Sequence, residues 1–428
     1  MYKDIKLFFL GVLGLVSLCM TSCSDDDLGA SIFDTTQSSL DRSLATFPLD
    51  TFLLKNYQEP YNLKFIYKLQ DISSDMNKNL TPADYEKACE LAVLCKYFWF
   101  DAYKESVSET FLKMYSPRII HVVGSANINA SSGSEVMGSS EGGKKVTLYK
   151  VNQLDYTDID KLNDLFYETL HHEFAHILNQ NYERPTDFAT FSTGRYNSAD
   201  WQTTPDSLVL SSGFITPYAY SQAREDWAEI IAKYITTDVD TWNGMIHSAS
   251  FGWETAMVDA VKFNALVRGG NYTPDSSKPD SIIHYASNPN LDSIGYQTYN
   301  YNSYVRQGNT YVTYQVVRKV IDRDSLDNPR DHKIVYEDND GIDGRQVILD
   351  KLDMARKWLK ENFDMDIDKV RMNVLRREYL TDEQGNFVRD ANGKLVNKLT
   401  QPSDTDPSKT LMETLLEQIS QYKALQTN

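Results

Sequence analysis

Residues 167–180, YETLHHEFAHILNQ, indicate the fold of the chain because they contain an H-E-x-x-H pentapeptide, His172 to His176. On a helix, side chains four residues apart lie on one face, so both imidazoles can bind one metal ion. Glu173 stands beside the first histidine and can take a proton from a metal-bound water. No other two histidines of the chain are four residues apart, so the register of the motif is unambiguous.

The residues around the motif predict an amphipathic helix. Thr157 and Asp158 offer N-cap chemistry ahead of it. The helix would place the histidines beside a buried stripe, which disfavours the alternative of a chance match on a surface helix. The apolar positions at helical spacing are Leu162, Leu165, Phe166, Leu170, Phe174 and Ile177.

A third metal ligand has to come from a later part of the chain. Asn179 and Tyr182 stand where the metzincin pattern H-E-x-x-H-x-x-G-x-x-H has glycine and histidine, so that pattern is absent. The best candidate stretch is 216–231, TPYAYSQAREDWAEII. Its apolar spacing predicts a second helix, for which Ser221 is the expected N-cap.

Two glutamates lie one turn apart on this second predicted helix. In gluzincins, a glutamate on a second helix completes the zinc site and an acid one turn later hydrogen-bonds a ligand histidine. By similarity to that pattern, we expect Glu225 to be the third ligand and Glu229 to hydrogen-bond a ligand histidine. The reverse assignment stays open, and Asp226 is a weaker alternative. Tyr218, seven residues before Glu225, could donate a hydrogen bond to a developing oxyanion. A packing role for this tyrosine is equally compatible with the sequence.

The first 22 residues predict a targeting segment. Lys3 and Lys6 precede an apolar run at 7–20 that is too short to cross a bilayer as a helix. The following Met-Thr-Ser-Cys resembles the lipobox of bacterial lipoproteins, with Cys23 as the lipidated residue, although Met replaces the usual Leu. A simple secretory signal and an uncleaved anchor are the alternatives. The acidic cluster at 24–27 resembles the tag that exports some lipoproteins to the cell surface, or it begins a solvated linker.

Composition restricts the partners. The chain has 428 residues and a formal net charge of −17, which argues against nucleic acid or anionic lipid as a partner. Its 12% aromatic residues can build a large core. Cys89 and Cys95 lie six residues apart in a helical stretch and would point to different faces, so no disulfide framework is expected.

Hydrophobic periodicity predicts further strands and helices. The pattern predicts a strand at 145–151. In zincins, the strand just ahead of the active-site helix is the sheet edge, so a resemblance to them implies that an extended peptide could pair with this strand. A helix is expected to begin with Thr81 as N-cap and Pro82 as its first residue. Other strand patterns occupy 62–69, 118–123 and 310–317, apolar helical stripes occupy 348–363 and 411–422, and turn signals at 376–400 predict a hairpin.

The lipobox, HEFAHILNQ and TPYAYSQAREDWAE together resemble the zinc-metallopeptidase lipoproteins found beside TonB-dependent outer-membrane uptake systems. The third motif also resembles the catalytic domain of anthrax lethal factor. This resemblance implies a gluzincin-like site with Zn²⁺ as cofactor and His172, His176 and Glu225 as its ligands. It also implies Glu173 as the catalytic base and Tyr218 as the oxyanion stabiliser.

The sequence and the resemblance predict an α+β fold, namely a zincin-like metalloprotease domain with the H-E-x-x-H helix, a small mixed sheet and C-terminal helices. The last segment is expected to pack on the catalytic domain. The expected parts are a lipoprotein signal peptide at 1–22, a flexible tether at 23–45, the catalytic domain at 46–271, an insertion or long loop at 272–338, and a helical segment with a hairpin at 339–428.

The expected function is zinc-dependent hydrolysis of peptide bonds by a surface-exposed outer-membrane lipoprotein linked to nutrient uptake. Its expected partners are a peptide or protein substrate, the membrane through the lipid anchor, and a TonB-dependent transporter complex. One alternative is a non-catalytic binding lipoprotein with a structural or vestigial zinc site. A structural zinc is normally closed by four protein ligands, whereas three are predicted here. Another is an amidase acting on glycoproteins or peptidoglycan peptides.

Overall fold

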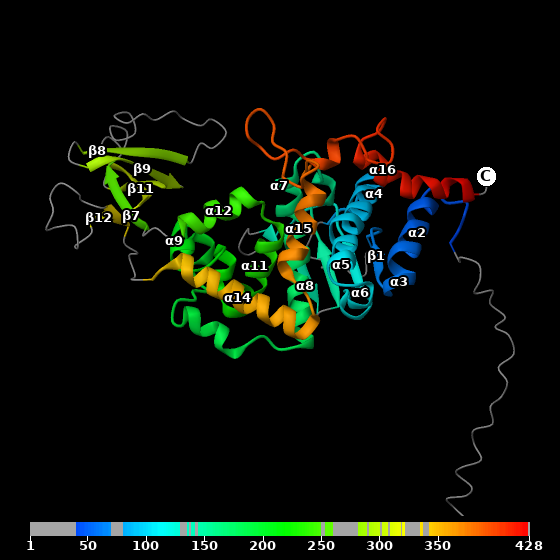
Figure 1. Ribbon diagram of the computed structural model, residues 1–428, viewed down its shortest axis with the longest axis horizontal. Helices are drawn as coiled ribbons and strands as arrows, with labels where there is room; N and C mark the ends of the chain where they lie inside the picture. Colours follow the sequence, from blue (N-terminus) through cyan, green and yellow to red (C-terminus); the bar gives the residue numbers. More distant parts are fainter. Residues whose placement is uncertain are drawn as a thin grey trace, which may run out of the picture.

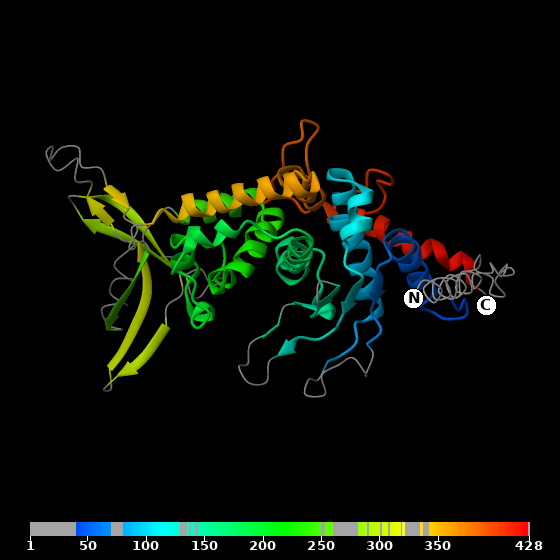
Figure 2. The same cartoon turned by 90° about the horizontal axis from the view of Figure 1, so that it is seen from below.

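A helical body lies along one side of a small sheet, as Figures 1 and 2 show. Among the described residues, no helix is long and apolar enough to cross a membrane. Cys23, the signal segment and most of the predicted tether lie outside the described residues. The computed structural model describes residues 40–69, 80–128, 135–136, 138–141, 144–249 and 342–426, and the backbone of strands at 253–259, 281–288, 291–299, 302–306, 309–317, 319–321 and 334–336.

The sheet is mixed, as predicted, and its strand order is β1-β2-β6-β5. The first three strands are parallel, and β5 pairs antiparallel with β6. The prediction that residues 145–151 form the sheet edge is wrong, because β5 covers that side of β6. The sequence of β5 is GSSE, which carries no apolar alternation to reveal it. The four strands are β1 (Lys64–Ile66), β2 (Ile119–Val122), β5 (Gly138–Glu141) and β6 (Lys145–Leu148).

Helix α4 (Tyr85–Leu94) begins later than predicted. Asp84 is its N-cap residue, so the prediction of Thr81 as N-cap and Pro82 as first residue is wrong. The reason is tertiary: the backbone N–H of Asp84 donates to Oδ1 of Asn152, 2.8 Å away, and the carbonyl oxygen of Thr81 accepts a bond from the loop after β2. The segment is therefore extended along the end of the sheet. Further on, Cys89 and Cys95 are buried free thiols, as expected.

The H-E-x-x-H motif lies on a helix that starts where the sequence predicts. Asp158 caps α7 (Ile159–Leu162) by accepting from the backbone N–H of Lys161. The chain continues through the π-helical turn η5 (Asn163–Tyr167) into α8 (Glu168–Asn181). The predicted apolar stripe is buried apart from Leu165, which packs partly buried against the core.

The second predicted helix is divided in two. Thr216 caps the short helix α10 (Pro217–Ser221) by accepting from the backbone N–H of Ala219. Gln222 is extended and precedes α11 (Ala223–Thr236). The predicted N-cap role of Ser221 is therefore wrong, because its hydroxyl donates to the carbonyl oxygen of Tyr218 instead.

Three C-terminal helices complete the body. The predicted stripe of α14 (Gly344–Phe363) is buried, and α15 (Ile367–Glu378), which the pattern did not predict, packs on α11 and α5. The predicted hairpin at 376–400 begins only after Glu378, and its chain turns at Gly385 and Gly393, both with positive φ. The last helix, α16 (Leu411–Ser420), packs on α4 and α2.

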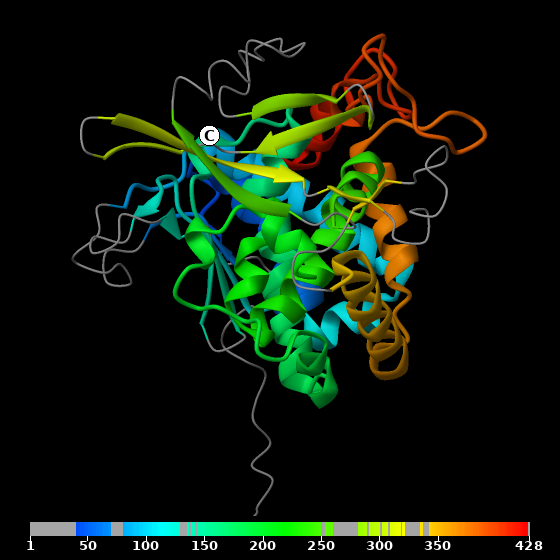
Figure 3. The same cartoon turned by 90° about the vertical axis from the view of Figure 1, so that its left-hand side faces the viewer.

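The strands between residues 253 and 336 gather at one end of the molecule, as Figures 1 and 3 show. The predicted strand at 310–317 is confirmed as β11 and pairs with β7 and β10. These strands are β7 (Trp253–Asp259), β8 (Ser281–Asn288), β9 (Leu291–Tyr299), β10 (Asn302–Arg306), β11 (Asn309–Val317), β12 (Lys319–Ile321) and β13 (Ile334–Tyr336), and a separate pair is β3 (Asn127–Ile128) with β4 (Glu135–Val136).

The other helical elements surround this framework. They are α2 (Phe47–Leu53), η1 (Leu54–Gln58), α3 (Glu59–Tyr61), η3 (Cys95–Phe100), α5 (Asp101–Ser106), α6 (Glu109–Tyr115), η4 (Val151–Gln153), η6 (Thr186–Ser192), η7 (Trp201–Thr203), α9 (Asp206–Ser211), α12 (Val239–Ser248), η9 (Lys398–Thr400) and η10 (Gln421–Leu425). Of these, η3 supplies several of the largest buried rings, including that of Trp99, which packs against Phe174 of α8.

A buried ion pair joins α11 to α14. Nζ of Lys351 lies 2.7 Å from Oδ2 of Asp226, and each side chain is 1% exposed. The same ammonium group donates to the carbonyl oxygen of Gly213 and lies 4.0 Å from the ring centroid of Phe214. The hydroxyl of Tyr196 donates to Oδ2 of Asp226. Both charges are thus compensated out of water, which such a pair requires.

We expect Lys351→Met to destabilise the fold strongly. The substitution keeps the volume but leaves the carboxylate of Asp226 buried without a cation, which costs about 3–5 kcal/mol. Urea unfolding followed by circular dichroism measures the change. Lys357→Met is the control, because this lysine of the same helix is 76% exposed and its loss should change the free energy of unfolding by less than about 0.5 kcal/mol. Equal effects of the two substitutions would show that Lys351 does not stabilise the fold by pairing with the buried Asp226.

Candidate metal centre

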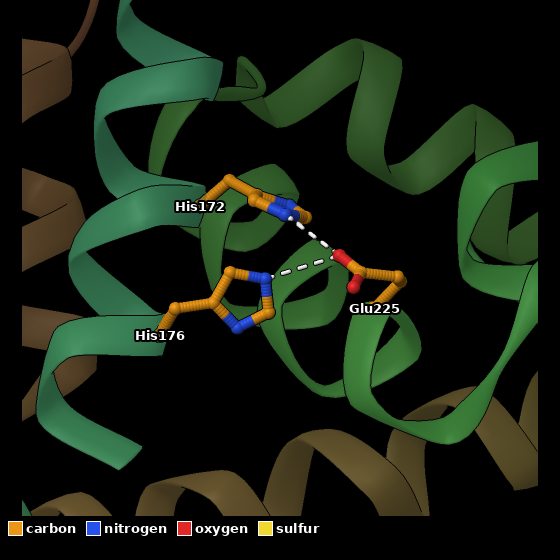
Figure 4. A group of neighbouring side chains, drawn as sticks. All are labelled: His172, His176 and Glu225. Atoms are coloured by element: carbon orange, nitrogen blue, oxygen red, sulfur yellow. Dashed lines mark hydrogen bonds and ion pairs between the residues drawn. The ribbon is translucent and has the colours of Figure 1, made fainter. Parts of the chain in front are cut away.

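Three side chains from two helices converge on one point, as Figure 4 shows. Helix α8 presents His172 and His176 on one face, and α11 presents Glu225 opposite them. Oε2 of Glu225 lies 3.1 Å from Nε2 of His172 and 3.0 Å from Nε2 of His176. Among the described residues, these form the one group of three whose donor atoms could hold a metal, all within 4.8 Å of one another.

The donor set fits zinc. Two imidazole nitrogens and a carboxylate oxygen are ligands that this ion takes, and bonds of about 2.0–2.1 Å at tetrahedral angles separate donors by about 3.3 Å. The observed separations of 3.0 and 3.1 Å are close to that value. All three side chains are buried, so bulk water would compete little with them for a bound ion.

Glu229 binds the ring nitrogen of His172 that faces away from Glu225. Its Oε1 lies 2.6 Å from Nδ1 of the imidazole, and its Oε2 accepts from the hydroxyl of Thr216 at 2.5 Å. This contact orients the ring so that Nε2 faces His176 and Glu225. Glu225 thus lies against both imidazoles and Glu229 against the other nitrogen of His172, and their expected roles as ligand and supporting group stay predictions. Asp226 faces away and pairs with Lys351.

The electrostatics of the cluster favour a cation. Burial alone would lower the pKa of His172, but its hydrogen bonds to Glu225 and Glu229 outweigh burial and raise that pKa to about 10. Burial alone would raise the pKa of Glu225, but its bonds to the two imidazoles hold it well below its ordinary value. The site therefore stabilises positive charge between carboxylates.

Glu173 follows His172 on α8, and its charge acts on that imidazole. Its side chain is buried, and its Oε2 has no hydrogen-bond partner among the described residues. An unsatisfied buried carboxylate oxygen is unfavourable unless water or a ligand pairs with it. Its place next to His172 makes it a suitable acceptor for a proton from water at the metal centre.

Tyr218 approaches the centre from α10, which the extended Gln222 separates from α11. Its ring centroid lies 5.7 Å from that of His172, and the side chain is 38% exposed. Burial, followed by the charges of Glu225, Glu229 and Glu173, raises the pKa of the phenol, to which its hydrogen bond with Glu225 also contributes. The hydroxyl therefore stays a neutral donor at physiological pH.

Sequence reasoning missed three residues around the centre. Thr216 holds Glu229, and the Thr-Pro pair is a recognisable helix start, although the sequence does not show this contact. Arg224 places Nε 3.3 Å from Oε1 of Glu225 and is 63% exposed. Trp201 lies against Tyr218, with ring centroids 5.1 Å apart. No periodic signal marks Arg224 or Trp201, because their positions depend on how the elements pack.

The sequence model of the family described as "Putative zinc-binding metallo-peptidase" matches residues 43–368. A solved structure from Bacteroides caccae, described as a putative zinc-binding metallo-peptidase, is similar at 26% sequence identity with a TM-score of 0.49. The likeness covers 81% of this chain and 95% of that chain. No curated protein matches this chain significantly. The family match includes both α8 and α11.

We expect Glu225→Gln and Glu229→Gln to weaken zinc binding unequally. Glu229→Gln should lower the affinity about 10–100-fold, because it removes a group that orients a ligand. Glu225→Gln should lower it further, since it alters a direct donor. Competition with a chromophoric chelator measures both affinities. Glu361→Gln, an exposed change on α14, should have no effect, and a larger loss for Glu229→Gln would reverse the two assignments.

Proposed function

Because the chain belongs to the family described as "Putative zinc-binding metallo-peptidase", whose model it matches, we propose that it is a zinc-dependent peptidase of the gluzincin type. The observation that carries the proposal is the position of Glu173. A buried carboxylate with an oxygen free of partners among the described residues lies next to a cluster of three donors. This is the arrangement that hydrolysis by an activated water needs.

Each residue of the centre has a separate task in peptide hydrolysis. His172, His176 and Glu225 would hold Zn²⁺, which supplies a Lewis acid that polarises the scissile carbonyl and lowers the pKa of water. Glu173 accepts the proton of the attacking water on Oε2 and returns it to the leaving amine nitrogen. The phenolic hydroxyl of Tyr218 donates a hydrogen bond to the oxyanion that develops on the carbonyl oxygen.

Two further residues hold this machinery in place. Glu229 keeps Nε2 of His172 directed at the centre by binding its Nδ1. Thr216 in turn donates its hydroxyl to Glu229 and limits the rotation of that carboxylate. Hydrogen bonds of this kind fix the tautomer and the direction of a ligand histidine.

The number of donors supports an enzyme over a binding protein with a structural zinc. Structural zinc sites normally have four protein ligands. Among the described residues, the group around Glu225 has three. A fourth coordination position would then be open to water and substrate, which a catalytic site requires. Extended X-ray absorption fine-structure spectroscopy of the zinc-loaded protein tests whether this fourth position is open. A fourth protein ligand there would favour the non-catalytic alternative.

We also propose that the protein is an outer-membrane lipoprotein that works with an uptake system. The lipobox-like segment ending at Cys23 and the acidic residues at 24–27 support an anchored, surface-exposed location. A TonB-dependent transporter complex is the proposed partner. Peptides released at the cell surface would then be available for import.

We expect Glu173→Gln to abolish hydrolysis while zinc stays bound. The amide keeps the shape of the side chain but cannot accept the proton, and general-base catalysis contributes about 10²–10⁴-fold to the rate. The measurement combines digestion of a peptide library with the zinc content by atomic emission. Glu183→Gln, an exposed change after α8, serves as the control. Hydrolysis at the wild-type rate by Glu173→Gln would remove Glu173 from the mechanism.

We expect Cys23→Ser to release the protein from the membrane. Without the thiol no acyl chain can be attached, and a protein without acyl chains loses its stable anchor. Incorporation of labelled palmitate and fractionation of cells expressing the full chain measure both effects. Membrane association that persists in the variant without label would show that another segment holds the protein.

A further inference from the structure

Trp201 and Tyr218 form a short row of rings that ends at the metal centre. The ring of Tyr218 lies 5.7 Å from that of His172, with the planes inclined by 31°. The ring of Trp201 lies 5.1 Å from that of Tyr218, with the planes inclined by 56°. An aromatic surface therefore begins beside a proposed ligand and extends away from it.

Trp201 differs in burial from the other tryptophans whose side chains the structure describes. It is only partly buried and stands outside the core cluster, and Tyr218 is 38% exposed. An aromatic ring left partly in water gains free energy when a ligand covers it, and Trp and Tyr often anchor binding sites. The buried tryptophans of the core are Trp99, Trp227, Trp242 and Trp358.

The loop that carries Trp201 is held firmly against α10. The backbone N–H of Asn197 donates to the carbonyl oxygen of Tyr220, 2.9 Å away. Oδ1 of Asn197 accepts from the backbone N–H groups of Ala199 and Asp200. The carbonyl oxygen of Asp200 accepts from the hydroxyls of the two threonines that end the next turn, at 203 and 204. The indole is therefore presented by an ordered loop.

We propose that Trp201 and Tyr218 line a subsite for a large apolar or aromatic side chain of the peptide, next to the scissile bond. The proposal rests on the proposed peptidase function. The two rings offer an apolar face without a charge, so Phe, Tyr, Leu or Met gains more from this contact than a small or charged residue. Trp201 thus determines specificity and does not touch the reacting atoms.

Binding of uncleaved peptides tests the subsite. Zinc-loaded Glu173→Gln protein is titrated with dye-labelled peptides of one sequence, in which one residue at a time is Phe, Leu, Ala, Lys or a glycosylated Ser. Fluorescence anisotropy gives the affinities. We expect Phe or Leu at one position to bind about tenfold more tightly than Ala, in line with the contribution of one hydrophobic pocket. Adding Trp201→Ala should remove most of this ratio, and adding Trp201→Phe should retain part of it.

Tyr85→Ala is the matched control, because this tyrosine is 37% exposed and belongs to α4. It should leave the ratio unchanged. An unchanged ratio in the Trp201→Ala protein, or tightest binding of the Lys or glycosylated peptide, would overturn the subsite. If Trp201→Ala does not fold, the Trp201→Phe variant decides, because an undiminished ratio in that protein would also overturn the subsite.

Digestion by the protein with Glu173 intact separates this proposal from the peptidase function. Cleavage without a Trp201-dependent preference would refute the subsite alone. A Trp201-dependent binding preference without any cleavage would refute the peptidase function and leave a peptide-binding surface.

Discussion

The hydrogen-bonded contact between α8 and α11 is the constraint on which the site depends. His172 is bound by Glu229 on one nitrogen and by Glu225 on the other, and Glu225 also binds His176. All four side chains are buried. Breaking one contact would leave a buried polar group unpaired at a cost of about 1–3 kcal/mol. The helices are thereby held in one register, because a shift of one turn would separate each pair.

Helix α11 carries three acidic side chains with three different roles. Glu225 and Glu229 face α8, while Asp226 lies about 100° further round the helix, the angle between successive residues. Asp226 therefore meets Lys351 of α14, and burial lowers the pKa of Lys351 and raises that of Asp226 while their attraction opposes both shifts. Glu168 of α8 and Lys233 of α11 form a second, partly buried pair that also joins these two helices. Paired charges thus help to position the helices around the centre, whose own carboxylates face the imidazoles.

Much of the site could be predicted from the sequence, since its parts are local. The spacing of His172 and His176 requires only that they lie on one helix, and the cap at Asp158 and the stripe of α14 are equally local signals. The spacing of Glu225 and Glu229 is also a local signal, because it is about one turn of a helix. Strand β5 has no clear periodic pattern, so it could not be predicted in this way. The analysed patterns also did not predict α15.

Only the tertiary structure decided which glutamate meets which imidazole nitrogen. Both glutamates lie on the same face of α11, so the choice depends on the position of that helix relative to α8. The start of α4 was likewise decided by the side chain of the distant Asn152, and the edge of the sheet by the pairing of β5 with β6. Trp201 joined the site through a loop held to Tyr220. A sequence determines the local turn and the face of a helix, whereas distances between elements arise only when the buried surfaces of the whole chain pack together.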